Sequence, residues 1–133
     1  METRVDIKTY SPLVLAYIGD AVHELYVRGR LVAEANMPVN RLHTAATGYV
    51  SANAQFEAFH IIEDVLTEEE MAVFKRGRNA KSQSVPKNAE LSHYRIATGF
   101  EALLGYLHIS GQADRLEFIL KETFDKMKEQ KGL

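Results

Sequence analysis

Two apolar stretches of the chain each contain a single charged residue, and in both stretches that residue is a carboxylate. Residues 11–22 read SPLVLAYIGDAV, where Asp20 is the only charge, and residues 96–107 read IATGFEALLGYL, where Glu101 is the only charge. An ionised carboxylate among apolar groups is costly unless something pairs with it, and a divalent cation is one such partner. The two acids are therefore the first candidates for chemistry.

Small residues surround both acids. Gly and Ala allow helix backbones to approach closely, which two acids need in order to share one metal ion. Mg²⁺ binds oxygen ligands at about 2.0–2.1 Å and readily takes water and phosphate as further ligands, so a shared site suits phosphodiester hydrolysis. Glu24 lies one turn beyond Asp20, and Thr98 lies nearly one turn before Glu101. Either could join as a further ligand or hydrogen-bond to one.

The residues alone leave simpler interpretations open. The two acids could be unrelated, each paired with Arg28, Arg95 or a backbone donor, and spacing alone slightly favours this alternative. His23 and Glu24 resemble the start of a zinc-protease motif, but the second His is absent because position 27 is Val27. The five histidines have no metal-ligand spacing, which favours structural or surface roles for them.

The charges are unevenly distributed along the chain, although the net charge is only −2. Residues 75–95 carry six Lys or Arg against one acid, whereas residues 57–71 carry acids and no Lys or Arg. A solvated loop beside an acidic turn is the plain interpretation. The basic segment also contains Ser, Asn and Gln, which hydrogen-bond phosphate and sugar oxygens, so it is a candidate nucleic-acid-binding surface. Its candidate residues are Arg76, Arg78, Asn79, Lys81 and Lys87.

Composition limits the class of protein. A chain of 133 residues with 46% hydrophobic and 26% charged residues is typical of one globular domain, here expected to span residues 1–133. No apolar run reaches the roughly 18–20 residues that cross a bilayer, and the start of the chain lacks a signal-peptide pattern. The absence of cysteine excludes disulfides and thiolate chemistry. We therefore expect a cytoplasmic protein with no membrane contact.

The chain is predicted to be all-α, because no stretch shows sustained strand alternation. The helices that carry Asp20 and Glu101 are apolar around most of their circumference, so one small domain cannot bury both fully and a homodimer is expected. The long polar loop at residues 79–90 is expected to be mobile when no nucleic acid is bound and to close over it on binding. The predicted elements are a helix from Ser11-Pro12 to near Asn36 and Pro38, a helical region at 40–63 interrupted near Thr47-Gly48, a helix capped by Thr67 that ends near Gly77 or Arg78, and helices at about 91–109 and 113–128.

Three segments carry a resemblance to a known family. Residues 15–27, LAYIGDAVHELYV, resemble the ribonuclease III signature, and residues 98–107, TGFEALLGYL, resemble the second conserved block of that fold. Residues 74–107 as a whole are similar to the Mini-ribonuclease III branch, which lacks the appended double-stranded-RNA-binding domain. The resemblance implies a dimeric, all-α ribonuclease III-type endonuclease domain. It also implies Mg²⁺-dependent hydrolysis of double-stranded RNA with 5′-phosphate and 3′-hydroxyl ends, and a role in maturing precursor 23S ribosomal RNA. Asp20 and Glu101 would hold the metal.

The chain departs from the ordinary ribonuclease III pattern at three acidic positions. Acids are usual seven and four residues before the signature Asp, where this chain has Leu13 and Ala16, and three residues before the Glu, where it has Thr98. The Mini-III branch is known for a reduced acidic set. We therefore expect one Mg²⁺ held partly through water, and a second that arrives with RNA phosphate. Two other classes stay open: a catalytically silent protein of this fold that binds structured RNA in ribosome assembly, and a helical dimerisation module without an RNA role.

Overall fold

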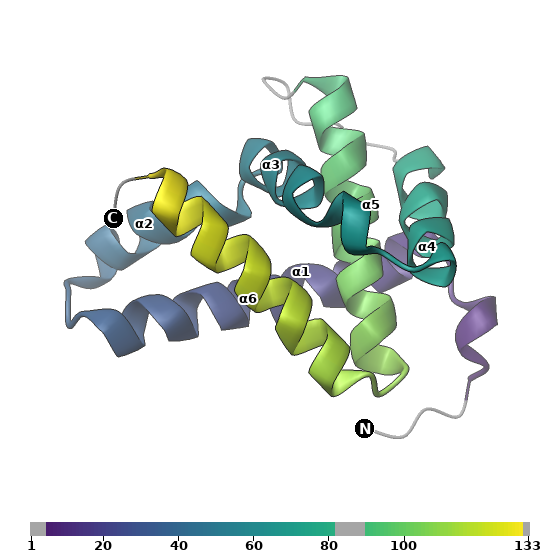
Figure 1. Cartoon of the computed structure of the whole chain (residues 1–133), viewed down its shortest axis with the longest axis horizontal. Helices are drawn as coiled ribbons and strands as arrows, with labels where there is room; N and C mark the ends of the chain where they lie inside the picture. The colour runs from purple at the N-terminus through teal and green to yellow at the C-terminus, as the bar shows by residue number, and fades with distance from the viewer. Residues whose placement is uncertain (1–4, 82–89, 132–133) are drawn as a thin grey trace.

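The computed structural model describes residues 5–81 and 90–131, and within these ranges the chain is helical and contains no strand (Figure 1). The all-α prediction is confirmed. Two short 3-10 helices, Ile7–Thr9 and Glu63–Val65, accompany the α-helices. The α-helices are α1 (Pro12–Glu34), α2 (Val39–Val50), α3 (Ala52–Ile62), α4 (Glu68–Asn79), α5 (Leu91–Ile109) and α6 (Ala113–Gln130).

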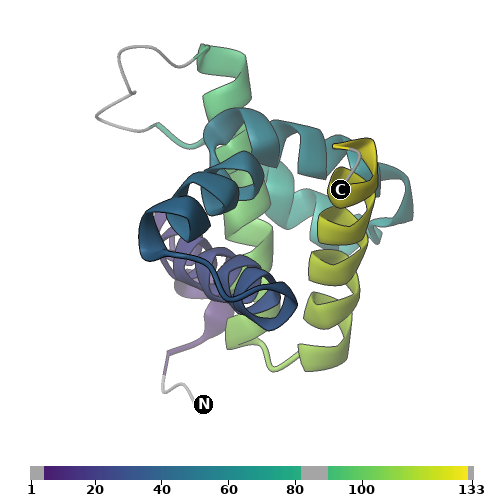
Figure 2. The same ribbon diagram turned by 90° about the vertical axis from the view of Figure 1, so that its left-hand side faces the viewer.

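Helix α5 forms the centre of the molecule. Every residue from 97 to 107 is buried except Glu101, because α1, α3 and α4 all pack against this helix. Figure 2 shows α5 in the middle, with α1 and α2 on one side and α6 on the other. The surrounding helices thus bring residues from distant parts of the chain to one stretch of α5.

Local signals set most of the helix ends. The Ser11 hydroxyl accepts a hydrogen bond from the Val14 amide at 3.2 Å, and Pro12 occupies the first turn, as predicted for the start of α1. Helix α1 ends at Glu34, slightly before the predicted end. The bounds of α5 are as predicted, and α6 continues two residues beyond its predicted end, to Gln130.

The predicted interruption at Thr47-Gly48 was wrong. Helix α2 continues through both residues, and the Thr47 hydroxyl donates to the His43 carbonyl oxygen at 3.0 Å. The break lies at Ser51, whose side chain accepts from the Ala54 amide and caps α3. A single Gly inside a helix has only a small free-energy cost. The Ser51 cap and tertiary packing together stabilise the fold by more than this cost, so the chain turns at Ser51.

The start of α4 is fixed to α6. Thr67 and Glu70 form the predicted capping box, with reciprocal hydrogen bonds of 2.9 and 3.1 Å. The buried Glu70 carboxylate also accepts two hydrogen bonds from Arg115 of α6, each 2.8 Å long, and Arg115 donates to the Val65 carbonyl oxygen as well. Helix α4 ends at Asn79, close to the predicted end.

None of the described helices is long and apolar enough to span a membrane.

Candidate active site

The backbones of α1 and α5 touch where the two helices cross. A Cβ atom placed on Gly19 would overlap the carbonyl group of Glu101, and one placed on Gly105 would overlap the carbonyl group of Leu15. Glycine at both positions is therefore required for this close approach, and a larger residue would force the helices apart. Asp20 follows Gly19 directly, and so the crossing places Asp20 next to Glu101.

The carboxylates of Asp20 and Glu101 meet at this crossing. Asp20 is exposed, Glu101 is half-buried, and the two side chains lie within hydrogen-bonding reach. Burial, together with the hydrogen bond and negative charge of Asp20, raises the pKa of Glu101 to about 9. A proton on Glu101 thus offsets the repulsion between the acids at neutral pH.

The donor set fits a hard divalent cation. A divalent cation between the two carboxylates would offset both negative charges, whereas the proton on Glu101 offsets one, and carboxylate oxygens are the ligands that Mg²⁺ prefers. Across residues 5–81 and 90–131, no three His, Asp or Glu side chains gather in a way that could hold a metal ion. A metal at this site would therefore take its remaining ligands from water and from substrate phosphate.

Two buried polar side chains form the wall behind Glu101. The Gln55 amide nitrogen of α3 lies 3.3 Å from Oε2 of Glu101 and 3.0 Å from Nδ1 of His23. His23 packs edge-to-face on Phe100, with ring centroids 5.4 Å apart. Burial lowers the pKa of His23 to about 4, although nearby Asp20 partly offsets this shift, so the imidazole is neutral.

Sequence reasoning did not single out Gln55, and it assigned His23 a structural or surface role. The available signal was an amide within the mainly apolar segment at residues 52–62, which many proteins carry without any functional meaning. Only the packing of α3 against α5 shows that this amide faces an acid.

The other two acid-site candidates differ in their surroundings. Glu24 forms a 3.0 Å ion pair with Arg28 on the same helix, and its charge contributes a small further rise in the pKa of Glu101. Arg28 thus pairs with Glu24, not with either acid of the crossing. The Thr98 hydroxyl donates to the Tyr94 carbonyl oxygen at 3.0 Å, so its hydrogen is used within α5.

The candidate RNA-binding residues lie at the end of α4. Arg76, Asn79 and Lys81 are exposed, and Arg78 donates from Nε to the Asn79 side chain at 3.1 Å. Lys87 lies outside the described residues, as does most of the predicted loop at 79–90. A Cβ atom on Gly77 would crowd Ala102 and Gly99, so the end of α4 is close to the part of α5 that carries Glu101.

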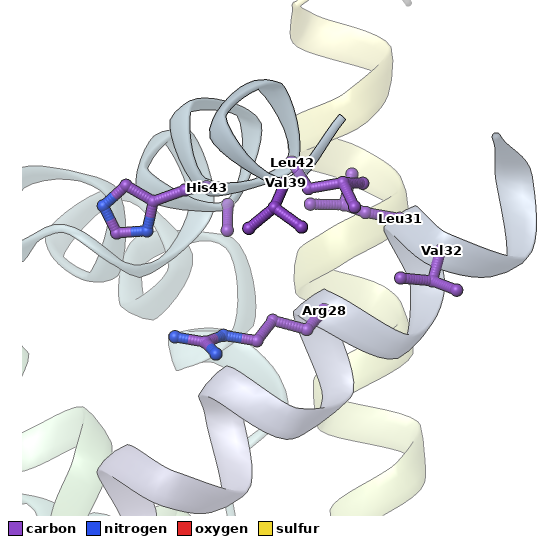
Figure 3. A pocket seen from close by; sticks show the side chains of 7 residues that line it. Arg28, Leu31, Val32, Val39, Leu42 and His43 are labelled. Carbon is purple, nitrogen blue, oxygen red and sulfur yellow. The ribbon is translucent and has the colours of Figure 1, made fainter. Parts of the chain in front are cut away.

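Helix α1 also has an apolar surface that no described helix covers. Its large exposed apolar residues include Tyr17 at 82% exposure, Leu25 at 75% and Val32 at 60%. Next to Val32, a hollow of about 180 Å³ lies between α1 and α2 (Figure 3). Its lining includes no acid, so it is not a candidate for the metal chemistry. The side chains that surround it include Arg28, Leu31, Val32, Val39, Leu42 and His43.

Comparison with known proteins gives a consistent result. Residues 13–112 match the Ribonuclease III domain family. Mini-ribonuclease 3 of Thermoanaerobacter sp. strain X514 is 50% identical over 127 residues, covering 96% of this chain and 89% of the relative. Mini-ribonuclease 3 of Enterococcus faecalis is 47% identical and covers 93% and 96%. A crystal structure of a Fusobacterium nucleatum protein superposes with a TM-score of 0.81 at 27% identity, covering 91% of this chain and 97% of that one.

The family match includes both α1 and α5, the helices that carry the paired acids, and the relatives match over nearly their whole length. The chain therefore belongs to the Mini-ribonuclease III branch of the ribonuclease III family, and it is an endoribonuclease that acts on double-stranded RNA.

Proposed function

We propose that Asp20 and Glu101 together hold the Mg²⁺ ion that supports cleavage of double-stranded RNA. The observation that carries this proposal is the contact of two acids at the glycine-lined crossing, where one of them has a strongly raised pKa. Acids in such a geometry bind a divalent cation in place of the proton.

The two carboxylates have different roles in this proposal. Asp20 is exposed, so it meets the RNA phosphate first, whereas Glu101 is half-buried and fixes the inner side of the site. When bound, the ion lowers the pKa of an attacking water and stabilises the charge that develops on the phosphate oxygens. Glu24 lies at the margin of the site as a further negative charge, held by Arg28.

Substitution of the two acids tests this proposal. Asp20→Asn and Glu101→Gln each remove a ligand charge with little change in volume. We expect each to lower the rate of cleavage of a long RNA duplex in Mg²⁺ by roughly 10²–10³-fold, the cost of several kcal/mol of charge stabilisation. Glu117→Gln, at an exposed position of α6, is the matched control and should cleave normally. Near-normal turnover by both site variants would refute the shared-metal site.

The basic end of α4 is the proposed RNA-binding surface. A-form RNA is recognised by its shape, its phosphates and its 2′-hydroxyl groups, which exposed Lys, Arg and Asn side chains contact without reading bases. The nearness of this end of α4 to the middle of α5 supports a continuous path from the basic surface to the acids. The proposed contacts are Arg76, Arg78, Asn79, Lys81 and Lys87.

Salt dependence of binding tests this surface. The double variant Arg76→Ala with Lys81→Ala should weaken duplex binding at all sequences and reduce the slope of log affinity against log salt by about one to two units. Cleavage at saturating RNA should largely persist, because both acids remain. Lys126→Ala, at an exposed position of α6, is the control for loss of a positive charge elsewhere on the surface. An unchanged affinity and slope in the double variant would move the RNA path elsewhere, for example over Arg28, Arg30 and Arg41.

We further propose that the enzyme acts as a homodimer on precursor 23S ribosomal RNA in the cytoplasm. The exposed apolar residues of α1 support a two-fold interface, which would place one site on each strand of a duplex. Depleting the protein in its host tests the substrate: precursor 23S RNA with unprocessed ends should accumulate and should be shortened by the purified enzyme. Mature 23S ends in depleted cells would refute this substrate.

A further inference from the structure

Glu101 has a buried polar support that the proposed metal chemistry does not use directly. Gln55 is 3% exposed and His23 is 4% exposed, and they come from α3 and α1, respectively. Buried amides and imidazoles are costly unless they are hydrogen-bonded, and these two satisfy each other and reach one carboxylate. An apolar pair would fill the same space at lower cost, so the polar pair calls for an explanation.

The hydrogen-bond pattern fixes the direction of the Gln55 amide. Its –NH₂ group has two hydrogens and lies 3.0 Å from Nδ1 of His23 and 3.3 Å from Oε2 of Glu101. Both atoms are acceptors when the His23 hydrogen is on Nε2 and Glu101 is ionised, as it would be with a cation bound. The opposite orientation of the amide would place its carbonyl oxygen against both acceptors. Phe100 holds the imidazole in place by edge-to-face packing. His23 therefore keeps an N–H donor of Gln55 directed at Glu101.

We propose that His23 and Gln55 are positioning residues that orient the Glu101 carboxylate for cation binding. This inference rests on the proposed role of Glu101 as a metal ligand. Gln55 engages one carboxylate oxygen and thereby holds the side chain in one orientation, so the ion binds a preformed ligand. Groups that orient metal ligands in this way typically contribute 10–100-fold in metal affinity or activity.

Cation affinity in the absence of RNA provides a direct test. The rise in melting temperature with Mg²⁺ concentration gives an apparent dissociation constant for each variant. Gln55→Met removes the donor and keeps an unbranched side chain of similar length. We expect it to weaken Mg²⁺ binding by about 10-fold or more and to lower kcat at limiting Mg²⁺, with the KM for RNA unchanged. Raising Mg²⁺ should restore much of the lost kcat.

A double-mutant cycle tests whether His23 acts through Gln55. His23→Leu should weaken Mg²⁺ binding less than Gln55→Met, and the double variant should be no weaker than Gln55→Met alone. His23→Asn, whose side-chain oxygen can accept from Gln55, should recover part of the affinity. If Gln55→Met does not fold, Gln55→Leu also removes the donor without adding a charge, and it should weaken Mg²⁺ binding in the same way.

Two controls separate the outcomes. Thr123→Val removes a buried hydroxyl from α6, far from the acids in the chain, and should lower stability without changing Mg²⁺ affinity. If Gln55→Met behaves like Thr123→Val, Gln55 is only a core residue and this inference is overturned. If Glu101→Gln itself leaves Mg²⁺ affinity unchanged, the proposed metal site fails, and that failure is distinguishable from failure of the positioning role.

Discussion

Helices α1 and α5 each carry one acid in an apolar stretch, yet their surroundings differ. Around Glu101, α5 is buried on every side. Around Asp20, α1 buries only one stripe, which includes Leu15 and Gly19, while Tyr17 on the other side is 82% exposed. The two helices have similar compositions over these stretches, so their burial follows from position: α5 lies inside a ring of helices and α1 lies at its edge.

This difference gives the two acids unequal environments. Burial raises the pKa of Glu101 to about 9, and the exposed Asp20 contributes to that rise as its neighbour. Because α1 lies at the edge, it also exposes an apolar surface to water. We propose that a second copy of the chain covers this surface. A site between a central helix and a peripheral helix is thus firmly held on one side and open to substrate on the other.

The largest expected effect concerns the crossing itself. Gly19→Ala would place a methyl group against the Glu101 carbonyl, and we expect a loss of about 3 kcal/mol or more in the free energy of unfolding. Gly29→Ala is the matched control on the same helix, since nothing lies within 4 Å of its Cβ position. It should gain about 0.5–1 kcal/mol from helix propensity. Urea denaturation measures both, and equal effects would mean that the backbones do not touch.

The contrast between buried and exposed leucines comes next. Leu104→Ala on α5 removes a side chain with 0% exposure and should cost about 2–5 kcal/mol at every protein concentration. Leu25→Ala on α1, at 75% exposure, should cost much less, and its cost should depend on protein concentration because it would act through the proposed dimer. Thermal unfolding at two concentrations distinguishes the two, and a concentration-independent loss at Leu25 would argue against its place in an interface.

Self-association tests the exposed side of α1 directly. Tyr17→Arg places a charge at the most exposed residue of this apolar surface and should weaken the proposed dimerisation by roughly 30-fold, as for the loss of an interface anchor. Phe118→Arg on α6, also an exposed aromatic position, is the control and should leave the dimer intact. Sedimentation at micromolar concentration measures the effect. A wild-type monomer under these conditions would contradict the proposed interface.

The effect most specific to the unequal acids is on pH-dependent stability. The pKa of Glu101 is about 9 in the folded protein and about 4.5 in an unfolded chain, so the folded state retains a proton between these values. Stability without divalent cation must therefore fall as pH rises from about 4.5 to about 9.

Glu101→Gln should remove this decline and raise the melting temperature in chelator near pH 8. The useful range is from about pH 7 upward, because the pKa of His23 is about 4 and its ring is already neutral there. Glu117→Gln provides the matched control. A decline that persists unchanged in Glu101→Gln would show that another group retains the proton.

Sequence reasoning identified the features that depend on local chemistry. The start of α1, the capping box of α4 and the bounds of α5 all follow from residues that are neighbours in the chain. The pairing of Asp20 with Glu101 was also accessible, because each acid stood out against an apolar stretch and small residues marked the contact.

What sequence reasoning missed depends on contacts between distant residues. The break at Ser51 competes with a weaker local signal at Gly48, and tertiary packing contributes to the choice between them. Gln55 has no local feature that links it to Glu101, since only the packing of α3 on α5 brings the two together. The exposure of Tyr17 could not be predicted either. An apolar sequence predicts that a helix is buried, but it does not say which other part of the protein covers each face of the helix.

The α1–α5 crossing has a consequence for synthesis of the enzyme. Helix α1 is made early and α5 late, and their contact closes a loop that spans most of the chain. Such long-range contacts form only after the intervening segments are available, and they slow folding. A nascent chain that ends before α5 has Asp20 but lacks Glu101, so it cannot assemble the paired acids. The topology thus delays assembly of the proposed cleavage site until most of the polypeptide has been made.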